Sequence, residues 1–173
     1  MPRPRLIIDD LGLTANRLLL PIDLARCPPE IFPVANSFTK PFDGEVLLLH
    51  VFEPRQGAAR RGVGEGELRR AEQHLERIGQ DCLSPKIQAS YRVRVGVPAE
   101  EIRAEAAARN VDLILLGVFA PSPWRRLLGW DSGRTARDVV VGAPCRVFVI
   151  DLRTRFNCFR RWAKEGTWLQ SAA

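Results

Sequence analysis

The sequence predicts a single α/β domain: a doubly wound parallel sheet of five strands with helices on both faces. Three observations predict this fold. Four short apolar runs show little alternation, as in strands buried on both faces; they cover residues 17–23, 45–52, 111–117 and 145–150. A fifth run alternates apolar and polar residues. The segments between the runs have helical periodicity, and strands that alternate with helices form parallel sheets with right-handed crossovers.

The segment 27–44 predicts a short or kinked helix between the first two strands. Pro33 is tolerated in a helix only near its start, which limits the length of a regular helix here. The apolar residues still recur at helical spacing: Ile31, Val34, Phe38 and Phe42.

Two longer helices are predicted over 67–82 and 98–110. The second opens with Pro98 and two glutamates, which the helix dipole favours at an N-terminus, and it ends at Asn110. A further helix before the strand at 145–150 completes the alternation. The helix over 67–82 carries charges opposite an apolar stripe of Leu68, Ala71, Leu75, Ile78 and Cys82.

Residues 86–95 predict a strand at the edge of the sheet, because strict alternation leaves one of its faces in water. With this strand third along the chain, the simplest winding gives the order 3-2-1-4-5. Ligands of open α/β sheets bind beyond the carboxyl ends of the strands, where the order reverses. Asp23 ends the predicted first strand and Gly117 the fourth, so we expect a site between them. The alternative role of Asp23 is to cap the helix that follows the first strand.

Composition and charge narrow the function classes. The chain has 173 residues, of which 46% are apolar, and no run approaches the roughly 18 apolar residues of a membrane span. Asp9 and Asp10 interrupt the apolar run near the N-terminus, so we expect no signal peptide and a cytoplasmic protein. The net charge of +6 comes mainly from both ends of the chain, which argues against nucleic-acid binding by the central domain.

Reactive side chains form no catalytic or metal-binding pattern in the sequence. The cysteines are far apart and lack CxxC spacing, and the only histidines are His50 and His74, so we expect reduced thiols and no protein-bound metal. His50 ends a buried strand without a nucleophile at a defined spacing, which favours a structural role. We therefore expect a protein that is not an enzyme. The four cysteines are Cys27, Cys82, Cys145 and Cys158.

Four sequence blocks resemble, in order and spacing, the signature blocks of the universal stress protein family. They are "LLLPIDLA", "GEVLLLHVFEP", "VRVGVPAEEIRAEAAARNVDLILLG" and "ARDVVVGAPCRVFVI". The resemblance covers residues 16–151, which leaves an N-terminal extension at 1–15 and a basic, aromatic tail at 152–173. It implies a regulatory domain of the stress response that binds ATP or AMP across the switch point, the place where the strand order reverses. Magnesium is expected only in association with the nucleotide.

The resemblance also implies the site residues. Asp23 would face the adenosine, Val51 and Leu116 would line the base pocket, and Gly117 would let the chain approach the ribose and phosphates, since glycine exposes its backbone N–H. The full predicted nucleotide-binding set is Pro21, Asp23, Val51, Leu116, Gly117, Ala120, Gly129, Gly133 and Arg134.

The predicted phosphate loop departs from the family pattern of Gly, two residues, Gly, nine residues, Gly, then Ser or Thr. Ala120 replaces the second glycine, and Pro121 and Pro123 each remove an N–H donor. The third glycine is either Gly129, followed by Trp130, or Gly133, followed by Arg134.

Two interpretations of this loop stay open. In the first, Arg125, Arg126 or Arg134 replaces the lost donors, since a guanidinium binds phosphate bidentately. In the second, Trp124 and Trp130 pack over a cleft that no longer binds triphosphate. We expect weak binding of ATP or AMP; the alternative is a homodimeric interaction module that binds no nucleotide.

The strand at 145–150 predicts a homodimer. It lies at the second edge of the sheet and is apolar toward both faces, so we expect the same strand of a second copy to cover it. The tail at 152–173 has the pattern of a short basic amphipathic helix. We expect it to dock on the protein itself rather than on an anionic membrane surface. The interaction-module alternative implies a protein partner.

Overall fold

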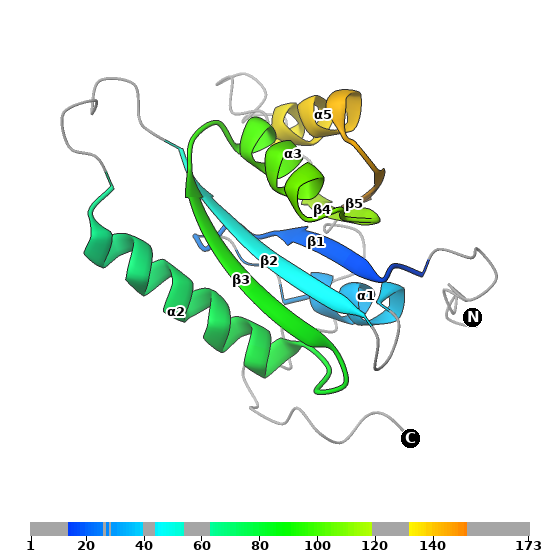
Figure 1. Ribbon diagram of the computed structural model, residues 1–173, viewed down its shortest axis with the longest axis horizontal. Coiled ribbons are helices and arrows are strands. Elements are labelled where there is room, and N and C mark those ends of the chain that lie inside the picture. Colours follow the sequence, from blue (N-terminus) through cyan, green and yellow to red (C-terminus); the bar gives the residue numbers. More distant parts are fainter. Residues whose placement is uncertain are drawn as a thin grey trace.

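The computed structural model describes residues 14–25, 27, 29–39, 44–53, 63–118 and 132–151. Its five strands form one parallel sheet in the order β3-β2-β1-β4-β5, which confirms the predicted fold class (Figure 1). The strands are β1 (Arg17–Pro21), β2 (Glu45–Phe52), β3 (Gln88–Val95), β4 (Leu113–Val118) and β5 (Arg146–Asp151). The described helices are α1 (Ile31–Phe38), α2 (Glu65–Cys82), α3 (Pro98–Ala108) and α5 (Ser132–Gly142).

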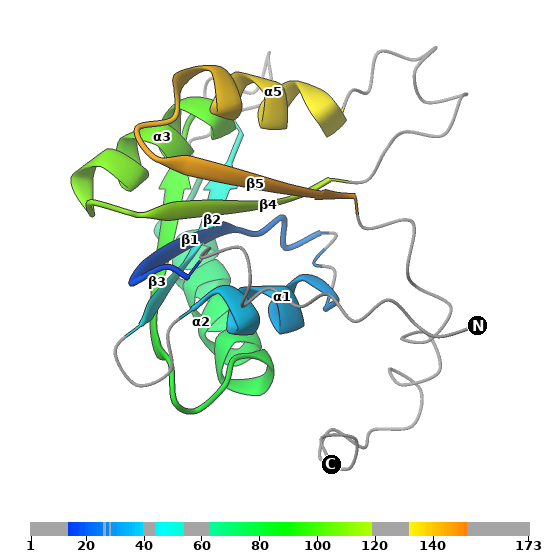
Figure 2. The same ribbon diagram turned by 90° about the vertical axis from the view of Figure 1, so that its right-hand side faces the viewer.

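Helices cover both faces of the sheet. Figure 2 shows α1 and α2 on one side and α3 and α5 on the other. The consecutive residues Leu18, Leu19 and Leu20 of β1 are all fully buried, as unalternating apolar runs predict for a central parallel strand. None of the helices in the described part of the chain has the length and apolar character of a membrane span.

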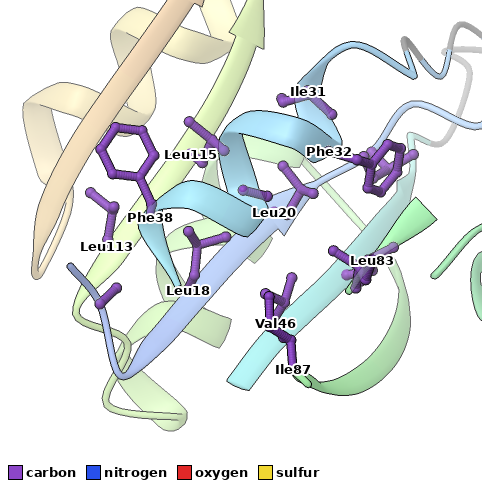
Figure 3. Close-up of a cluster of buried hydrophobic side chains, with 14 of the residues drawn as sticks. Leu18, Leu20, Ile31, Phe32, Phe38, Val46, Leu83, Ile87, Leu113 and Leu115 are labelled. Carbon is purple, nitrogen blue, oxygen red and sulfur yellow. The ribbon is translucent and has the colours of Figure 1, made fainter. Parts of the chain in front are cut away.

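Each face of the sheet has its own hydrophobic core. Under α1 and α2, Leu18 and Leu20 pack with Phe32 and Phe38 of α1 (Figure 3). Under α3 and α5, Leu19 packs with residues of β2, β4 and the two helices. Full burial of one such side chain contributes about 1.5 to 3 kcal/mol, so the two layers together hold the sheet rigidly.

The strand β1 ends at Pro21, two residues before the predicted end, and its pairing with β4 ends earlier still. β1 pairs with β2 over five residues but with β4 only at Leu18–Leu113 and Leu19–Ile114. The Ile22 N–H still donates to the Leu49 carbonyl at 2.8 Å, so the chain follows β2 while it leaves β4. The strands β1 and β4 therefore part toward their carboxyl ends.

Other elements also begin or end at residues that differ from the predicted ones. β4 begins at Leu113 rather than at residue 111 and continues one residue past Gly117, so the prediction that Gly117 ends this strand is wrong by one residue. Within the described residues of the segment 27–44, the helix is the short α1, in which Pro33 is the third residue, where no intrahelical N–H bond is lost. Phe42 lies outside the described residues.

The two longer helices have caps that explain their limits. α2 begins two residues earlier than predicted, and the Gly64 N–H ahead of it donates to the Glu67 carboxylate at 3.3 Å. α3 has Pro98 at its first position, as predicted. The helix ends at Ala108, and Asn110 follows with a φ of 49°, a left-handed conformation that asparagine adopts readily after a helix.

The edge strand β3 alternates as predicted. Ala89, Tyr91 and Val93 pack against the core under α2, and Gln88 and Arg92 are exposed. The predicted wet face is seen at Gln88 and Arg92, but the strand begins at Gln88 rather than at residue 86, and Val95, which the alternation places on the buried face, is 43% exposed.

Candidate functional site

A cavity of about 420 Å³ lies beyond the carboxyl ends of β1, β2 and β4, where the strand order reverses. We call it the switch-point cavity. It occupies the gap that opens where β1 and β4 part, and the first turns of α3 and α5 contribute to its walls through Pro98 and Thr135. Its volume falls in the range of small-molecule sites.

Five predicted site residues line this cavity. Pro21 and Asp23 come from the end of β1, Val51 from β2, and Leu116 and Gly117 from β4. They meet because the carboxyl ends of parallel strands all lie at the same end of the sheet.

The other predicted residues do not line the cavity or lie outside the described part of the chain. Gly133 is the second residue of α5. Arg134 is exposed in the same helical turn and is not among the lining residues. Ala120 and Gly129 fall in 119–131, outside the described residues, as do the loop arginines and tryptophans.

Several lining residues were missed by the sequence analysis. His50 and Glu53 flank the predicted Val51 at the end of a buried strand, and their polarity at that place was an available signal. The helical contributions depend on how α3 and α5 pack, which no local pattern reveals. The residues missed are Ile22, Ile31, Leu49, His50, Glu53, Pro98, Ile102, Val118, Thr135 and Ala136.

Asp23 combines a structural contact with a place in the cavity wall. Its Oδ1 accepts a hydrogen bond from the Ala25 N–H at 3.0 Å, which closes a turn after β1. It does not cap α1, since that helix begins only at Ile31. The side chain is exposed, and its second oxygen has no hydrogen-bond partner among the described residues, which leaves it available to a ligand.

His50 is buried and held in one orientation. Its Nδ1 lies 2.9 Å from the Ile22 carbonyl oxygen, and its ring meets the Phe52 ring edge-on with centroids 4.7 Å apart. Only 8% of the residue is exposed, yet it lines the switch-point cavity. The predicted structural role is therefore accompanied by contact with the candidate site.

The charges of the described cavity wall are acidic. Asp23 and Glu53 contribute carboxylates, and no lysine or arginine is among the described lining residues. Cys27 lies near Asp23, but burial raises the pKa of its thiol to about 12, so it stays uncharged at neutral pH. The first turn of α5 places the positive end of a helix dipole beside Thr135.

A second, polar depression of about 380 Å³ lies at the amino ends of the strands, at the other end of the sheet from the switch-point cavity. Its carboxylates are already engaged: Asp112 accepts hydrogen bonds from the N–H groups of Asn16 and Arg17 at 2.9 Å, and Glu45 accepts one from Ser90. These bonds stabilise the amino ends of the strands, so this depression is structural.

The described residues that line the cavity include no cysteine. Cys27, Cys82 and Cys145 are free, and Cys158 lies outside the described residues. Within the ranges that the structure describes, no three His, Cys, Asp or Glu side chains gather as metal ligands.

Known proteins resemble the chain over nearly all of this sheet. A family model described as the universal stress protein family matches residues 14–151. Universal stress protein MJ0531 of Methanocaldococcus jannaschii is 28% identical over 143 residues, which cover 78% of this chain and 81% of that protein.

Solved structures share the fold. The hypothetical protein MJ0577 has a TM-score of 0.63 and 22% identity, with 81% of this chain and 98% of that chain covered. The universal stress protein from Archaeoglobus fulgidus in complex with dAMP has a TM-score of 0.54 and 17% identity, covering 78% of this chain and 97% of that one.

Proposed function

The chain belongs to the universal stress protein family, and from this premise we propose that it is a regulatory protein whose switch-point cavity binds an adenine nucleotide. The cavity itself carries the proposal. It brings Pro21, Asp23, Val51, Leu116 and Gly117 to one place at the reversal of strand order, where open α/β sheets bind their ligands. The structural neighbour from Archaeoglobus fulgidus, solved in complex with dAMP, supports the choice of an adenine nucleotide.

The wall suits the nucleoside better than a triphosphate. Its carboxylates accept hydrogen bonds from ribose hydroxyls but repel phosphate, and its described lining residues include no cationic side chain. The loop sequence that follows β4 has lost backbone donors at Pro121 and Pro123. We therefore propose that AMP binds at least as tightly as ATP.

A regulatory role fits the side chains that line the cavity better than catalysis does. The Nδ1 of His50 is engaged by a backbone carbonyl, and the described wall pairs no nucleophile with a base. The alternative function is an interaction module that binds no nucleotide, and the exposure of Val149 on the edge strand β5 is the observation that favours it.

Calorimetric titration of the full chain with AMP and ATP tests the proposed function. We expect AMP to bind and to displace ATP. The Asp23→Asn variant keeps an oxygen for the Ala25 N–H but loses the carboxylate charge, so it should bind AMP about 3- to 30-fold more weakly, the difference between a charge-assisted and a neutral hydrogen bond.

The matched control is Asp81→Asn, which changes an exposed aspartate in α2 that does not line the cavity. It should bind AMP as the wild type does. Tight ATP binding that AMP does not displace would show that the loop holds the phosphates after all. Absence of binding of both nucleotides would favour the interaction module.

A further inference from the structure

The strand β3 lies at an edge of the sheet and pairs with β2 alone among the described strands (Figure 1). The Gln88 N–H donates to the Gly44 carbonyl and the Gly96 N–H to the Phe52 carbonyl, each at 3.0 Å. In a parallel ladder every second residue bonds to the same neighbour, so the even-numbered residues of β3 face β2. The odd-numbered residues point their N–H and C=O groups away from the sheet: Ala89, Tyr91, Val93 and Val95.

No described segment pairs with this outer edge. None of the outward N–H and C=O groups of β3 takes part in a backbone hydrogen bond with another described segment. Such unpaired groups are a template for a further strand. Exposed apolar side chains continue the edge, since Val95 is 43% and Val97 is 51% exposed. The edge is therefore able to accept an extended chain.

The two faces of β3 set the chemistry of such a chain. On the α2 side, Tyr91 and Val93 are half-buried against the core and offer apolar neighbours. On the other side, Arg94 bonds to Glu105 of α3, and Arg92 lies on the same face. Arg92 is exposed and has no hydrogen-bond or ion-pair partner within the described ranges. The side chains of an added strand would alternate between these two faces.

Positive charge prevails on the α3 side of β3. The buried Glu105 carboxylate contacts both Arg94 and Arg109, whose side chains remain 49% and 39% exposed. One carboxylate cannot neutralise two guanidinium groups, and Arg92 adds a further cation two residues before Arg94. An added strand is therefore stabilised if it places acidic side chains on this face.

We propose that β3 binds an extended segment of a partner protein in which acidic and apolar residues alternate. The backbone of that segment pairs with the outward groups of β3. Its acidic side chains lie beside Arg92 and Arg94, and its apolar side chains lie beside Tyr91 and Val93. No residue of β3 is among the described residues that line the switch-point cavity, so this surface is separate from the nucleotide site.

The arginines argue against two other occupants of the edge. A second copy that paired through β3 would bring Arg92 and Arg94 close to the arginines of its partner, and like charges on neighbouring strands destabilise a sheet. The segment 152–173 of the chain is itself basic. Charge of a single sign thus protects the edge from such pairing and leaves it open to a strand of opposite charge.

Amide hydrogen exchange in the full chain, followed by NMR, tests the pairing. The probe is a synthetic heptapeptide that alternates glutamate and valine. Without it, the Tyr91 and Val93 amides should exchange at least about tenfold faster than those of Arg92 and Arg94, which bond to β2. With about nine-tenths of the protein bound, exchange at Tyr91 and Val93 should slow about tenfold, because only the free protein exchanges.

Two results of this experiment would overturn the proposal. If the Tyr91 and Val93 amides are already slow without the peptide, another segment of the chain occupies the edge. If the peptide leaves their exchange unchanged, it does not pair with β3.

A charge reversal tests the recognition of acidic residues. Arg92→Glu should bind the glutamate–valine peptide about 3- to 10-fold more weakly than the wild type does, and a lysine–valine peptide more tightly. A variant that failed to fold would not gain the second peptide. The matched control is Arg137→Glu, which alters an exposed arginine of α5 and should bind the first peptide as the wild type does. Equal weakening in both variants, or none in Arg92→Glu, would contradict recognition by β3.

Discussion

Glu105 is a buried charged residue that the helical pattern of the sequence does not predict. It is 2% exposed and lies on the face of α3 that packs against the sheet. Arg94 of β3 donates to its Oε2 from Nε at 3.0 Å and from a terminal nitrogen at 2.6 Å, and Arg109 contacts its Oε1 at 3.3 Å. The hydrogen bond to Glu105 raises the pKa of Arg94.

Loss of this carboxylate should destabilise the fold. In Glu105→Ala, two arginines lose their partner and a buried volume is left empty, so we expect the free energy of unfolding to fall by about 2 to 3 kcal/mol. Urea denaturation measures the change, with Glu72→Ala, an exposed glutamate of α2, as the control. A loss no larger than in the control would mean that solvent replaces both arginine contacts.

The sequence allowed the place of a residue to be predicted where that residue ends a predicted strand. Asp23 and Gly117 were placed by the rule that ligands bind beyond the carboxyl ends of parallel strands, whereas Pro21, Val51 and Leu116 were implied by the family resemblance. All five line the cavity, and their contact with a nucleotide stays a prediction. Prediction missed Pro98 and Thr135, whose positions depend on how helices pack over the sheet. It also gave Asp23 as a helix cap or a ligand, whereas the residue closes a turn and still lines the cavity.

At the level of elements, type and order were predictable and ends were not. The strand β2 has the predicted bounds, because its apolar run is sharply limited at Glu45 and Phe52. The strand β1 stops at Pro21, and its pairing with β4 ends earlier, at Leu19, which the apolar run from 17 to 23 does not indicate. The switch-point cavity lies beyond the point where β1 and β4 stop pairing.

The packing of α2 on β3 gives a prediction at this level. A Cβ added at Gly79 would lie 2.5 Å from Cε1 of Tyr91, whereas one at Gly66 in the same helix would meet nothing within 4 Å. Gly66→Ala should raise the free energy of unfolding by about 0.5 to 1 kcal/mol, the gain in helix propensity. Gly79→Ala should lower it by about 1 to 3 kcal/mol, because the helix or the ring must move.

Thermal and urea unfolding of the two variants measures these changes. If Gly79→Ala were stabilised as much as Gly66→Ala, the Tyr91 ring would have to move aside freely, and the contact between α2 and β3 would not be fixed by this glycine.

For the whole molecule, the parallel sheet, its strand order and its two helical layers follow from the sequence pattern and are confirmed. The match to the universal stress protein family over 14–151 adds to this physical account. Assembly is a further matter, and we propose a homodimer through β5. That edge strand leaves Val149 42% exposed, and an apolar edge favours pairing with another strand.

The proposed dimer is tested with two matched valines on opposite edges. Val149→Lys on β5 should shift the protein toward the monomer in light scattering at micromolar concentration, because the charge would have to be buried between copies. Val95→Lys on β3, where the valine is 43% exposed, should leave the dimer intact. A monomeric wild type would refute the dimer and leave the edge to be covered by another segment.

The central claim, that the switch-point cavity binds an adenine nucleotide, is tested most directly by amide chemical shifts during an AMP titration. We expect the shifts to change at Asp23, Val51 and Gly117, which line the cavity. The shifts of Asn16 and Asn110, which lie at the amino ends of the strands, should stay unchanged. Shift changes confined to the amino ends of the strands, or no shift changes at saturating AMP, would contradict the claim.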